Sequence, residues 1–362
     1  MKAVSVKQTD TVRQVDLVLY LPWRRRVYAM AGLAILLALV VFLATAVGST
    51  QIPLGDLAKA WLSRLPFIEA AEVSTALQTI IFDIRLPRVL LAGLVGMALA
   101  VAGATYQGLF RNPLADPYLI GVSQGAALGA AAGFLLPVMA DAAMLGLIPV
   151  LAFAGGIGAV AVVYAIARVG KTLPVTTLIL AGVALGAFLA SITSYLIVIS
   201  GDRLHGIIAW ILGRFSVSNW AQVAIVAPYV IAGVAVISLY ARPLNVMQLD
   251  EEQAQQLGIN VERVKLVLLG VATLITASAV SFCGIIGFVG IIVPHAVRLV
   301  WGPDHRFLLP LSALAGASFL ILADTAARTL TAPAEMPVGV ITAFLGAPFF
   351  LYLLRRKKKA VF

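Results

Sequence analysis

Residues 103–133 read GATYQGLFRNPLADPYLIGVSQGAALGAAAG, and this stretch predicts two apolar helices joined at a polar corner. The corner, RNPLADP at 111–117, contains two prolines and an Asn-Pro step, which end the first helix and turn the chain. Glycines then recur at every fourth position, a spacing that leaves a bare helix face against which another backbone can pack closely. These helix-packing glycines are Gly121, Gly125, Gly129 and Gly133. We therefore expect a hairpin inside a dense bundle of membrane helices.

The composition of the whole chain agrees with a membrane bundle. Of the 362 residues, 61% are hydrophobic and only 12% are charged, and the mean hydropathy is +1.02, which is far above the range of soluble proteins. We predict an all-α integral membrane protein. The net charge of +10 comes from basic residues at the ends of apolar segments, where they set topology, so we expect no nucleic-acid partner. The single cysteine, Cys283, has apolar neighbours and is expected to be a packed thiol.

The apolar segments predict a bundle of ten transmembrane helices. We expect two of these spans to be short passes within residues 264–301, because Gly284, Gly287, Gly290 and Pro294 interrupt that stretch. The other eight expected spans are residues 27–47, 86–110, 118–136, 144–167, 175–200, 221–240, 307–326 and 337–354. The apolar patch at 207–212 is too short to cross a bilayer core of ~30 Å, so we expect it at the membrane interface, with Trp210 and Trp220 at headgroup depth.

Charge counting orients the bundle and defines its terminal segments. With ten spans both basic ends lie on the cytoplasmic side, together with most of the 26 lysines and arginines, as the positive-inside rule requires. Residues 1–26 then form a cytoplasmic N-terminal extension, residues 27–355 the ten-span domain, and residues 356–362 a basic cytoplasmic tail. The segment 242–265 is a polar cytoplasmic connection within the domain.

Two motifs resemble enzyme sites, but their context argues against chemistry. Residues 121–125 match the G-x-S-x-G elbow of serine hydrolases, yet Ser123 begins a glycine-striped helix rather than a strand-to-helix turn. Residues 165–172 nearly match a phosphate-binding loop, but Ala165 replaces its first glycine and no strand precedes it. We therefore expect no enzyme activity and neither cofactor nor metal bound by this chain; an intramembrane serine hydrolase is the alternative to test.

A proton-coupled multi-span transporter is the second alternative. Such carriers place an ionisable residue at membrane depth, and only Asp324, near the outer end of its span, comes close. If the chain is a transporter, its energy is therefore expected to come from another subunit.

The polar segment 242–265 contains the pattern of a short helix. An Asp and a Gln three residues apart form a capping box, two glutamates suit the helix N-terminus, and a glycine suits its end. Ala254 and Leu257 are expected to share a small apolar face. The segment is either a docking element for a soluble subunit or a solvated connector. Its candidate residues are Asp250, Glu251, Glu252, Ala254, Leu257 and Gly258.

Three arginines lie at the outer mouths of two spans, on the side that the positive-inside rule should deplete. They are Arg85, Arg88 and Arg328. They either reach lipid phosphates or hold an acidic partner from outside through charge-assisted pairs.

Long strings of this sequence resemble the permease subunits of type II ATP-binding-cassette (ABC) importers for iron chelates, haem and cobalamin. The resemblance covers about residues 27–355. The strings are RLPRVLLAG at 85–93, YQGLFRNPLADPYLIGVSQGAALGA at 106–130, LILAGVALGAF at 178–188, GIIGFVGIIVPHAVRL at 284–299, DTAARTL at 324–330 and MPVGVITAFLGAPFFLYLL at 336–354.

This resemblance implies the type II permease fold, a homodimer, and a place in the bacterial inner membrane. Two cytoplasmic subunits, which bind ATP and Mg, would dock on 242–265. A periplasmic binding protein would meet Arg85, Arg88 and Arg328. The cargo would be a large chelate, first a ferric siderophore or haem, with cobalamin as the alternative.

The resemblance also suggests a gate and a path. By position, the cytoplasmic gate falls on Asn112, Leu114, Val175 and Thr176, although Val175 departs from the polar residue of the cobalamin permease. The translocation path falls on the outer half of the fifth span, at Ser191, Thr193, Ser194 and Tyr195. A small, mostly uncharged lining suits a bulky chelate that must slide without being gripped.

Overall fold

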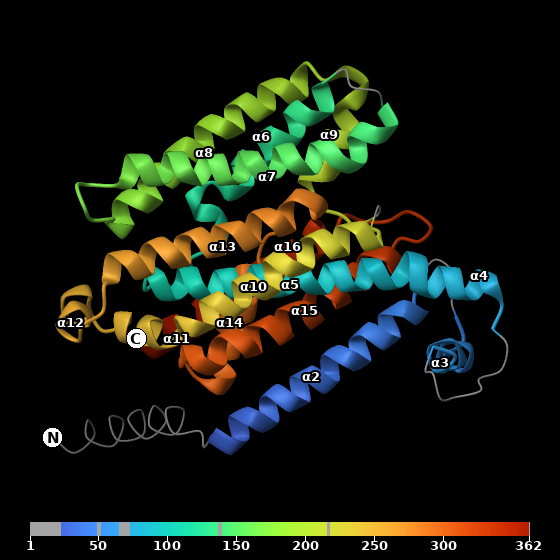
Figure 1. Cartoon of the computed structure of the whole chain (residues 1–362), viewed down its shortest axis with the longest axis horizontal. Helices are drawn as coiled ribbons and strands as arrows, with labels where there is room; N and C mark the ends of the chain where they lie inside the picture. Colours follow the sequence, from blue (N-terminus) through green and yellow to red (C-terminus); the bar gives the residue numbers. More distant parts are fainter. Residues whose placement is uncertain (1–22, 49–51, 65–72, 137–139, 216–217, 362) are drawn as a thin grey trace.

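The computed structural model describes residues 23–48, 52–64, 73–136, 140–215 and 218–361. Most of the long helices run along the long axis of the molecule (Figure 1). Of the expected N-terminal extension, residues 1–22 lie outside the described residues.

Ten helices in the described part of the chain correspond to the ten expected spans. Seven are long and apolar enough to cross a membrane by length and composition, and three apolar helices are shorter: α6, α14 and the Val338–Tyr352 part of α16. The predicted class, an all-α membrane bundle, is confirmed. The ten helices are α2 (Trp23–Ala46), α5 (Leu86–Leu109), α6 (Val122–Leu135), α7 (Ala140–Ala167), α8 (Val175–Val198), α10 (Trp220–Leu239), α13 (Val261–Cys283), α14 (Val289–Trp301), α15 (His305–Thr329) and α16 (Val338–Val361).

The break between α13 and α14 confirms that the stretch 264–301 is divided into two helices, while their crossing of the membrane as two passes stays a prediction. It falls at residues 284–288, where Gly284 and Phe288 both have left-handed backbone angles, with φ of 74° and 70°. Pro294 does not take part in the break; it lies inside α14, and α14 continues to Trp301. At ~1.5 Å per residue, the 13 residues of α14 are shorter than a bilayer core of ~30 Å.

Helix α5 lies at the centre of the bundle, packed against α10, α13, α14 and α15 (Figure 1). Glycines make the closest approaches: a Cβ atom at Gly103 would collide with the carbonyl of Gly290, and one at Gly96 with that of Gly316. Helix α2 lies at the periphery and is mostly exposed.

Helices α6, α7 and α8 form a second layer, which α7 joins to α13 (Figure 1). The glycine stripe of α6 faces α7: a Cβ at Gly125 would collide with the carbonyl of Gly155, and one at Gly129 with that of Leu151. Gly133 meets Ile148 less tightly. Gly121 differs, because it is the left-handed residue, with φ of 88°, that joins the short helix η2 (Pro117–Ile120) to α6.

The apolar patch 207–212 packs partly against the bundle, and its expected position at the membrane interface stays a prediction. It belongs to α9 (Leu204–Ile211), which follows the short helix η3 (Gly201–Arg203) and packs on α6. Trp210 is buried in a cluster with Ala126, Ala130 and Val280. Trp220 is partly exposed and donates its indole N–H to the carbonyl of Phe82 at 3.0 Å. The sequence showed only that the patch is too short to cross a membrane. Its packing against α6 is a long-range contact, which no local sequence pattern indicates.

Three distant segments are joined at one end of the bundle by backbone hydrogen bonds. The N–H of Val338 donates to the carbonyl of Gly213 at 2.9 Å, and the N–H of Arg214 donates to that of Cys283 at 2.8 Å. The end of α9, the end of α13 and the start of α16 therefore form one joint. The thiol of Cys283 is buried there, as expected, and donates to the carbonyl of Ala279.

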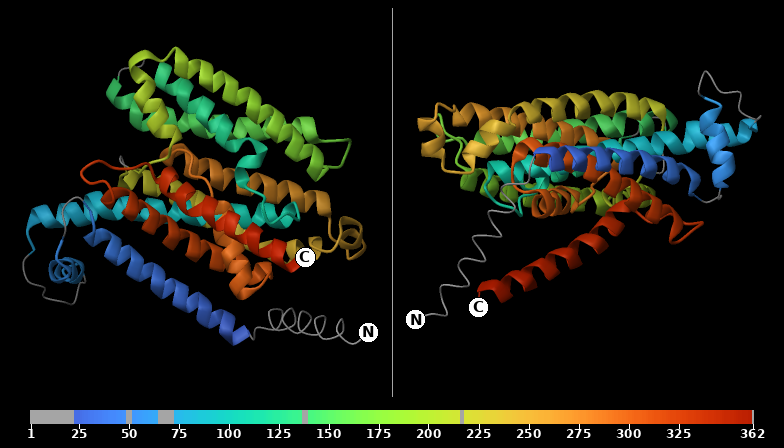
Figure 2. Two further views of the ribbon diagram at one scale, coloured as in Figure 1. Left: turned by 180° about the vertical axis from the view of Figure 1, so that it is seen from behind. Right: turned by 90° about the horizontal axis from the view of Figure 1, so that it is seen from below.

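The outer loop after α2 is partly ordered into α3 (Leu54–Leu62), α4 (Thr75–Gln78) and the π-helical turn η1 (Thr79–Arg85). Leu57 and Ala60 pack with Ile81 and Phe82 in a small separate core. At the other side of the molecule, α16 diverges from the bundle (Figure 2) and leaves large side chains exposed, including Phe344 and Leu351.

Candidate functional site

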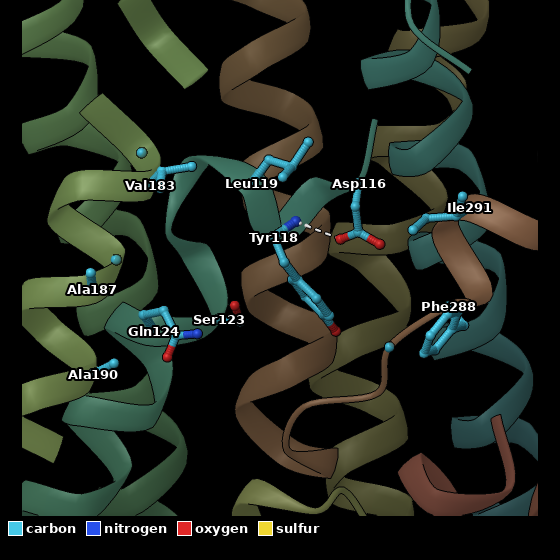
Figure 3. Close-up of a pocket in the computed structure, with 13 residues that line it drawn as sticks. Asp116, Tyr118, Leu119, Ser123, Gln124, Val183, Ala187, Ala190, Phe288 and Ile291 are labelled. Atoms are coloured by element: carbon cyan, nitrogen blue, oxygen red, sulfur yellow. Dashed lines mark hydrogen bonds between the residues drawn. The ribbon is translucent and has the colours of Figure 1, made fainter. Parts of the chain in front are cut away.

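A pocket of about 450 Å³ lies between α8 and the η2–α6 segment (Figure 3). Gly182 and Gly186 help to form it, because Gly182 lets α8 approach the carbonyl of Leu119 more closely than any side chain would allow. The break after α13 supplies the third wall. The lining residues are Asp116, Tyr118, Leu119, Ser123, Gln124, Gly182, Val183, Gly186, Ala187, Ala190, Gly287, Phe288 and Ile291. Small and uncharged groups therefore make up most of this wall.

Tyr118 holds the pocket's two halves together. Its hydroxyl donates to the carbonyl of Ile286 at 3.1 Å and accepts from the N–H of Ile286 at 3.3 Å, so η2 is tied to the break between α13 and α14. The N–H of Tyr118 donates to Asp116 at 2.7 Å (Figure 3). Burial raises the pKa of the Asp116 carboxyl to about 6, against the opposing effect of that N–H donor. The pocket thus contains a carboxyl group that changes charge near neutral pH.

The four predicted path residues lie on the next turns of α8, beyond the pocket's last α8 residue, Ala190. Ser191, Ser194 and Tyr195 are exposed, whereas Thr193 is buried. The three hydroxyl groups of Ser191, Thr193 and Ser194 donate to carbonyls one turn earlier in α8. Their role in a path stays a prediction. The pocket itself is lined by earlier residues of α8, namely Gly182, Val183, Gly186, Ala187 and Ala190, to which the sequence analysis gave no role.

The predicted gate residues lie at the end of the bundle where α5 ends and α8 begins (Figure 1). Asn112 and Leu114 are exposed on the corner, and the side-chain oxygen of Asn112 accepts from the N–H of Leu114 at 2.9 Å. Val175 and Thr176 are the first two residues of α8. Their function as a gate stays a prediction, although both elements lead directly to the pocket walls.

Two of the three predicted docking arginines, Arg85 and Arg328, are bound to the end of α2. Arg85 is buried and donates to the carbonyls of Thr45 and Ala46 at 3.0 and 2.8 Å. Arg328 is also buried and donates to the carbonyls of Ala44 and Val47 at 3.3 and 3.1 Å. Both guanidinium groups therefore fasten the end of α2 to the bundle.

Arg88 and Arg328 share a buried acid. Asp324 is 1% exposed, and its carboxylate lies 2.9 Å from Arg88 and 3.2 Å from Arg328. Arg88 also pairs with Glu335 at 2.9 Å, and the side chain of Glu335 is 41% exposed. Asp324, considered from sequence as an isolated intramembrane acid, is instead the centre of an ion-pair cluster joining α5 and α15.

The segment that we predicted to be cytoplasmic folds into α11 (Ala241–Met247) and α12 (Glu251–Gln256). Asp250 caps α12 by accepting from the N–H of Glu251, and Gly258 ends the segment with φ of 83°. That N–H, followed by Arg111 at 3.1 Å, lowers the pKa of the Asp250 carboxyl. Asp250 therefore caps α12 as expected, but through the N–H of Glu251 rather than that of Gln253, so the predicted Asp-Gln capping box is replaced by a simpler cap.

The two residues of the predicted apolar face of α12 differ in burial. Ala254 is fully buried, whereas Leu257 is 65% exposed. Glu252 is exposed beside it, and Glu251 is paired with Lys265 at 2.7 Å. Leu257 and Glu252 therefore present the outward surface of this short helix, and Ala254 attaches the helix to the bundle.

Within the described ranges, no group of three or more His, Cys, Asp or Glu side chains is arranged to hold a metal ion. Ser123 lies at the start of α6, so the hydrolase-like motif is part of a helix.

Comparison with known proteins identifies the kind of protein that shares this arrangement. Residues 36–356 match the FecCD transport family. The cobalamin import system permease protein BtuC of Halobacterium salinarum is 49% identical over 281 residues, which are 78% of this chain and 74% of that protein. The hemin transport system permease protein HmuU of Yersinia pestis is 41% identical over 279 residues, or 76% and 83% of the two chains.

A solved structure has the same fold. It is an inward-facing conformation of an ABC transporter described as the metal-chelate type, with a TM-score of 0.78 and 30% sequence identity, and the match covers 90% of this chain and 98% of that one.

Proposed function

The chain belongs to the FecCD transport family, and on that premise we propose that two copies of it form the membrane path of an ATP-driven importer for a bulky metal chelate. As a multi-pass permease subunit of an ABC importer, it performs no bond chemistry of its own. The pocket between α8 and η2–α6 is the observation on which the proposal depends.

The exposed face of α8 supports pairing with a second copy. Its exposed residues recur at helical spacing, from the pocket to the outer end of the helix, and several are large and apolar. They include Thr176, Leu180, Val183, Ala187, Ser191, Tyr195 and Val198. Helix α16 also has large exposed side chains and packs on few other elements. Two copies meeting along α8 and α16 would enclose the pocket walls in a central path, with both termini on the cytoplasmic side of a cytoplasmic membrane.

The cargo we propose is a metal-bound macrocycle, with cobalamin first and haem second. The relatives described above are permeases for these two compounds, and the cobalamin permease is the more similar of the two. The lining suits either, because small side chains and few charges allow a large ligand to pass without being held. Ferric siderophores, which the sequence analysis favoured together with haem, form the third arm of the test.

Two cytoplasmic ATPase subunits, which would bind ATP and Mg, are proposed to dock on α11 and α12. The exposed residues Leu257 and Glu252 provide the contact, and Asp250 and Gly258 define the short helix that carries them. ATP binding and hydrolysis would then bias two arrangements of the bundle, open outward and open inward.

Docking of a periplasmic binding protein through Arg85, Arg88 and Arg328 requires that these side chains exchange partners. Arg88 is the best placed of the three, because its partner Glu335 is partly exposed and can be replaced by an acid of the binding protein. Arg85 and Arg328 would first have to leave the carbonyls at the end of α2.

Uptake by the reconstituted importer tests the proposal. The chain, its cognate ATPase and its binding protein are assembled in proteoliposomes, and ATP-dependent uptake of cobalamin, haem and a ferric siderophore is measured. Ala187→Trp narrows the pocket and also enlarges the pairing face of α8, so uptake is measured per assembled complex, and we expect it to fall about tenfold or more. Ala235→Trp on α10 is the matched control, since it is an equally exposed alanine outside the pocket.

Three results would contradict the proposal. Uptake that continues without ATP, but stops with an uncoupler, would support a proton-coupled carrier. Equal uptake by the Ala187→Trp and Ala235→Trp variants would remove the pocket from the path. Labelling of Ser123 by a fluorophosphonate would support the hydrolase.

A further inference from the structure

Lys265 is a buried cation at the cytoplasmic end of α13. Its side chain is 3% exposed, and its ammonium group donates to Glu251 at 2.7 Å, to Glu262 at 3.2 Å and to the carbonyl of Leu173 at 3.2 Å. An ammonium group has three N–H donors, and each of them has an acceptor here. Two carboxylates facing one buried lysine form a compact and fully matched cluster.

This cluster joins three separate parts of the chain. Glu251 is the first residue of α12, while Glu262 and Lys265 belong to the first turns of α13. Leu173 lies two residues before α8 begins, in the turn 168–174. Its carbonyl accepts from Lys265, and its N–H donates to the other oxygen of Glu262 at 2.9 Å. Both backbone groups of Leu173 are therefore held by side chains of α13.

The links from α12 to the corner after α5 are different in kind. Arg111 pairs with Asp250 at 3.1 Å and donates to the carbonyl of Leu249 at 3.3 Å, and the two paired side chains are 41% and 56% exposed. Gln248, an exposed residue between α11 and α12, donates to the carbonyl of Gly108 in the last turn of α5 at 2.8 Å. Exposed pairs exchange readily with water, whereas a buried and fully matched cluster resists separation. The attachment of α12 to α8 is thus firmer than its attachment to the corner.

We propose that Lys265 is a positioning residue that makes α12 and the turn before α8 move as one unit, so that a displacement of α12 reaches the pocket wall through α8. The hydrogen bonds of Arg111 and Gln248 break during the same movement. The distance between α8 and the corner after α5, measured across the pocket, therefore changes. This inference rests on the proposed function, because it takes an ATPase acting on α12 as the source of movement.

The ratio of cargo transported to ATP hydrolysed tests the role of Lys265. In assembled complexes, Lys265→Met is expected to lower this ratio about tenfold while ATP hydrolysis continues, a size typical of coupling between sites. Lys265→Arg retains the charge and is expected to restore part of the ratio. Lys171→Met is the matched control, since Lys171 is an exposed lysine in the turn 168–174, which Lys265 contacts through Leu173. A purely structural role would reduce the yield of complex and leave the ratio unchanged, which would overturn the inference.

A distance measurement keeps the inference testable if the Lys265→Met variant does not assemble. Spin labels are attached in a Cys283→Ala background at two pairs of exposed positions, Gln256→Cys with Lys171→Cys and Gln256→Cys with Pro113→Cys. Between nucleotide-free and ATP-bound complexes, the first distance should stay constant and the second should shift. A shift in the first pair, or none in the second, would overturn the inference.

A result that contradicts the proposed function can be distinguished from one that contradicts the role of Lys265. Absence of uptake by the wild-type complex, for every cargo tried, would count against the importer and leave the spin-label distances to judge the role of Lys265.

Discussion

Replacing Asp324 by Asn should destabilise the outer end of the bundle. Asp324 is almost fully buried and lies 2.9 Å from Arg88 and 3.2 Å from Arg328. The Asp324→Asn side chain has nearly the same size, so the change removes one negative charge from beside two buried guanidinium groups without creating a cavity.

The expected loss follows from those two distances. At an effective dielectric constant of ~20, each pair attracts by about 5 kcal/mol before desolvation is considered. Arg88 keeps Glu335 at 2.9 Å, whereas Arg328 keeps the carbonyl oxygens of Ala44 and Val47, which are neutral. Measured costs of removing one partner from a buried ion pair are about 3–5 kcal/mol. Because these neutral acceptors remain, we expect Asp324→Asn to lower the free energy of unfolding by about 3 kcal/mol, the lower end of that range.

Thermal unfolding of the purified chain in detergent, compared with wild type, gives the measurement. Glu335→Gln is the matched control, since it removes the partly exposed partner of Arg88 and should cost less than about 1 kcal/mol. Equal losses for Asp324→Asn and Glu335→Gln would refute the reasoning, because burial would then have no influence on what the carboxylates contribute.

Two further predictions concern α6 and the pocket. Gly129→Leu should prevent α6 and α7 from packing, with a loss of about 3 kcal/mol or more in thermal unfolding, while Gly158→Leu, where a Cβ meets nothing within 4 Å, should be nearly neutral. The raised pKa of Asp116, about 6, means that its protonated form favours the folded state; that contribution is complete below about pH 4 and is lost as the pH rises through about 6. Asp116→Asn should therefore gain stability relative to wild type between pH 4 and pH 8; a difference that does not change with pH would contradict the assignment.

The spans were predictable because each is a continuous apolar segment bounded by charge, proline or glycine. The division of 264–301 into two helices was predictable for the same reason, since Gly284 marks the break. Pro294 was misleading: a proline inside a helix removes only one hydrogen bond, and α14 continues through it.

The pair of Asp324 with Arg328 is four residues apart on one helix and could have been predicted, whereas the pair of Arg88 with Asp324 joins residues 236 positions apart and could not. Arg88 and Arg328 could be found from their motifs, but their sharing of Asp324 became visible only when α5 and α15 were packed together. The pocket was missed for a related reason. Small residues at 182–190 permit close packing and also line a cavity, and the sequence contains no signal that separates the two.

The joint of α9, α13 and α16 has a consequence for biosynthesis. The carbonyl of Gly213 accepts from Val338, and that of Cys283 accepts from Arg214, so the turn after α9 is completed by partners that leave the ribosome much later. Chains are made from the N-terminus, so the carbonyl of Gly213 after α9 lacks its partner Val338 while α10 to α15 are inserted. Insertion of α16 is then the step that completes the joint. A chain truncated before Val338 would enter the membrane without the hydrogen bond to the carbonyl of Gly213.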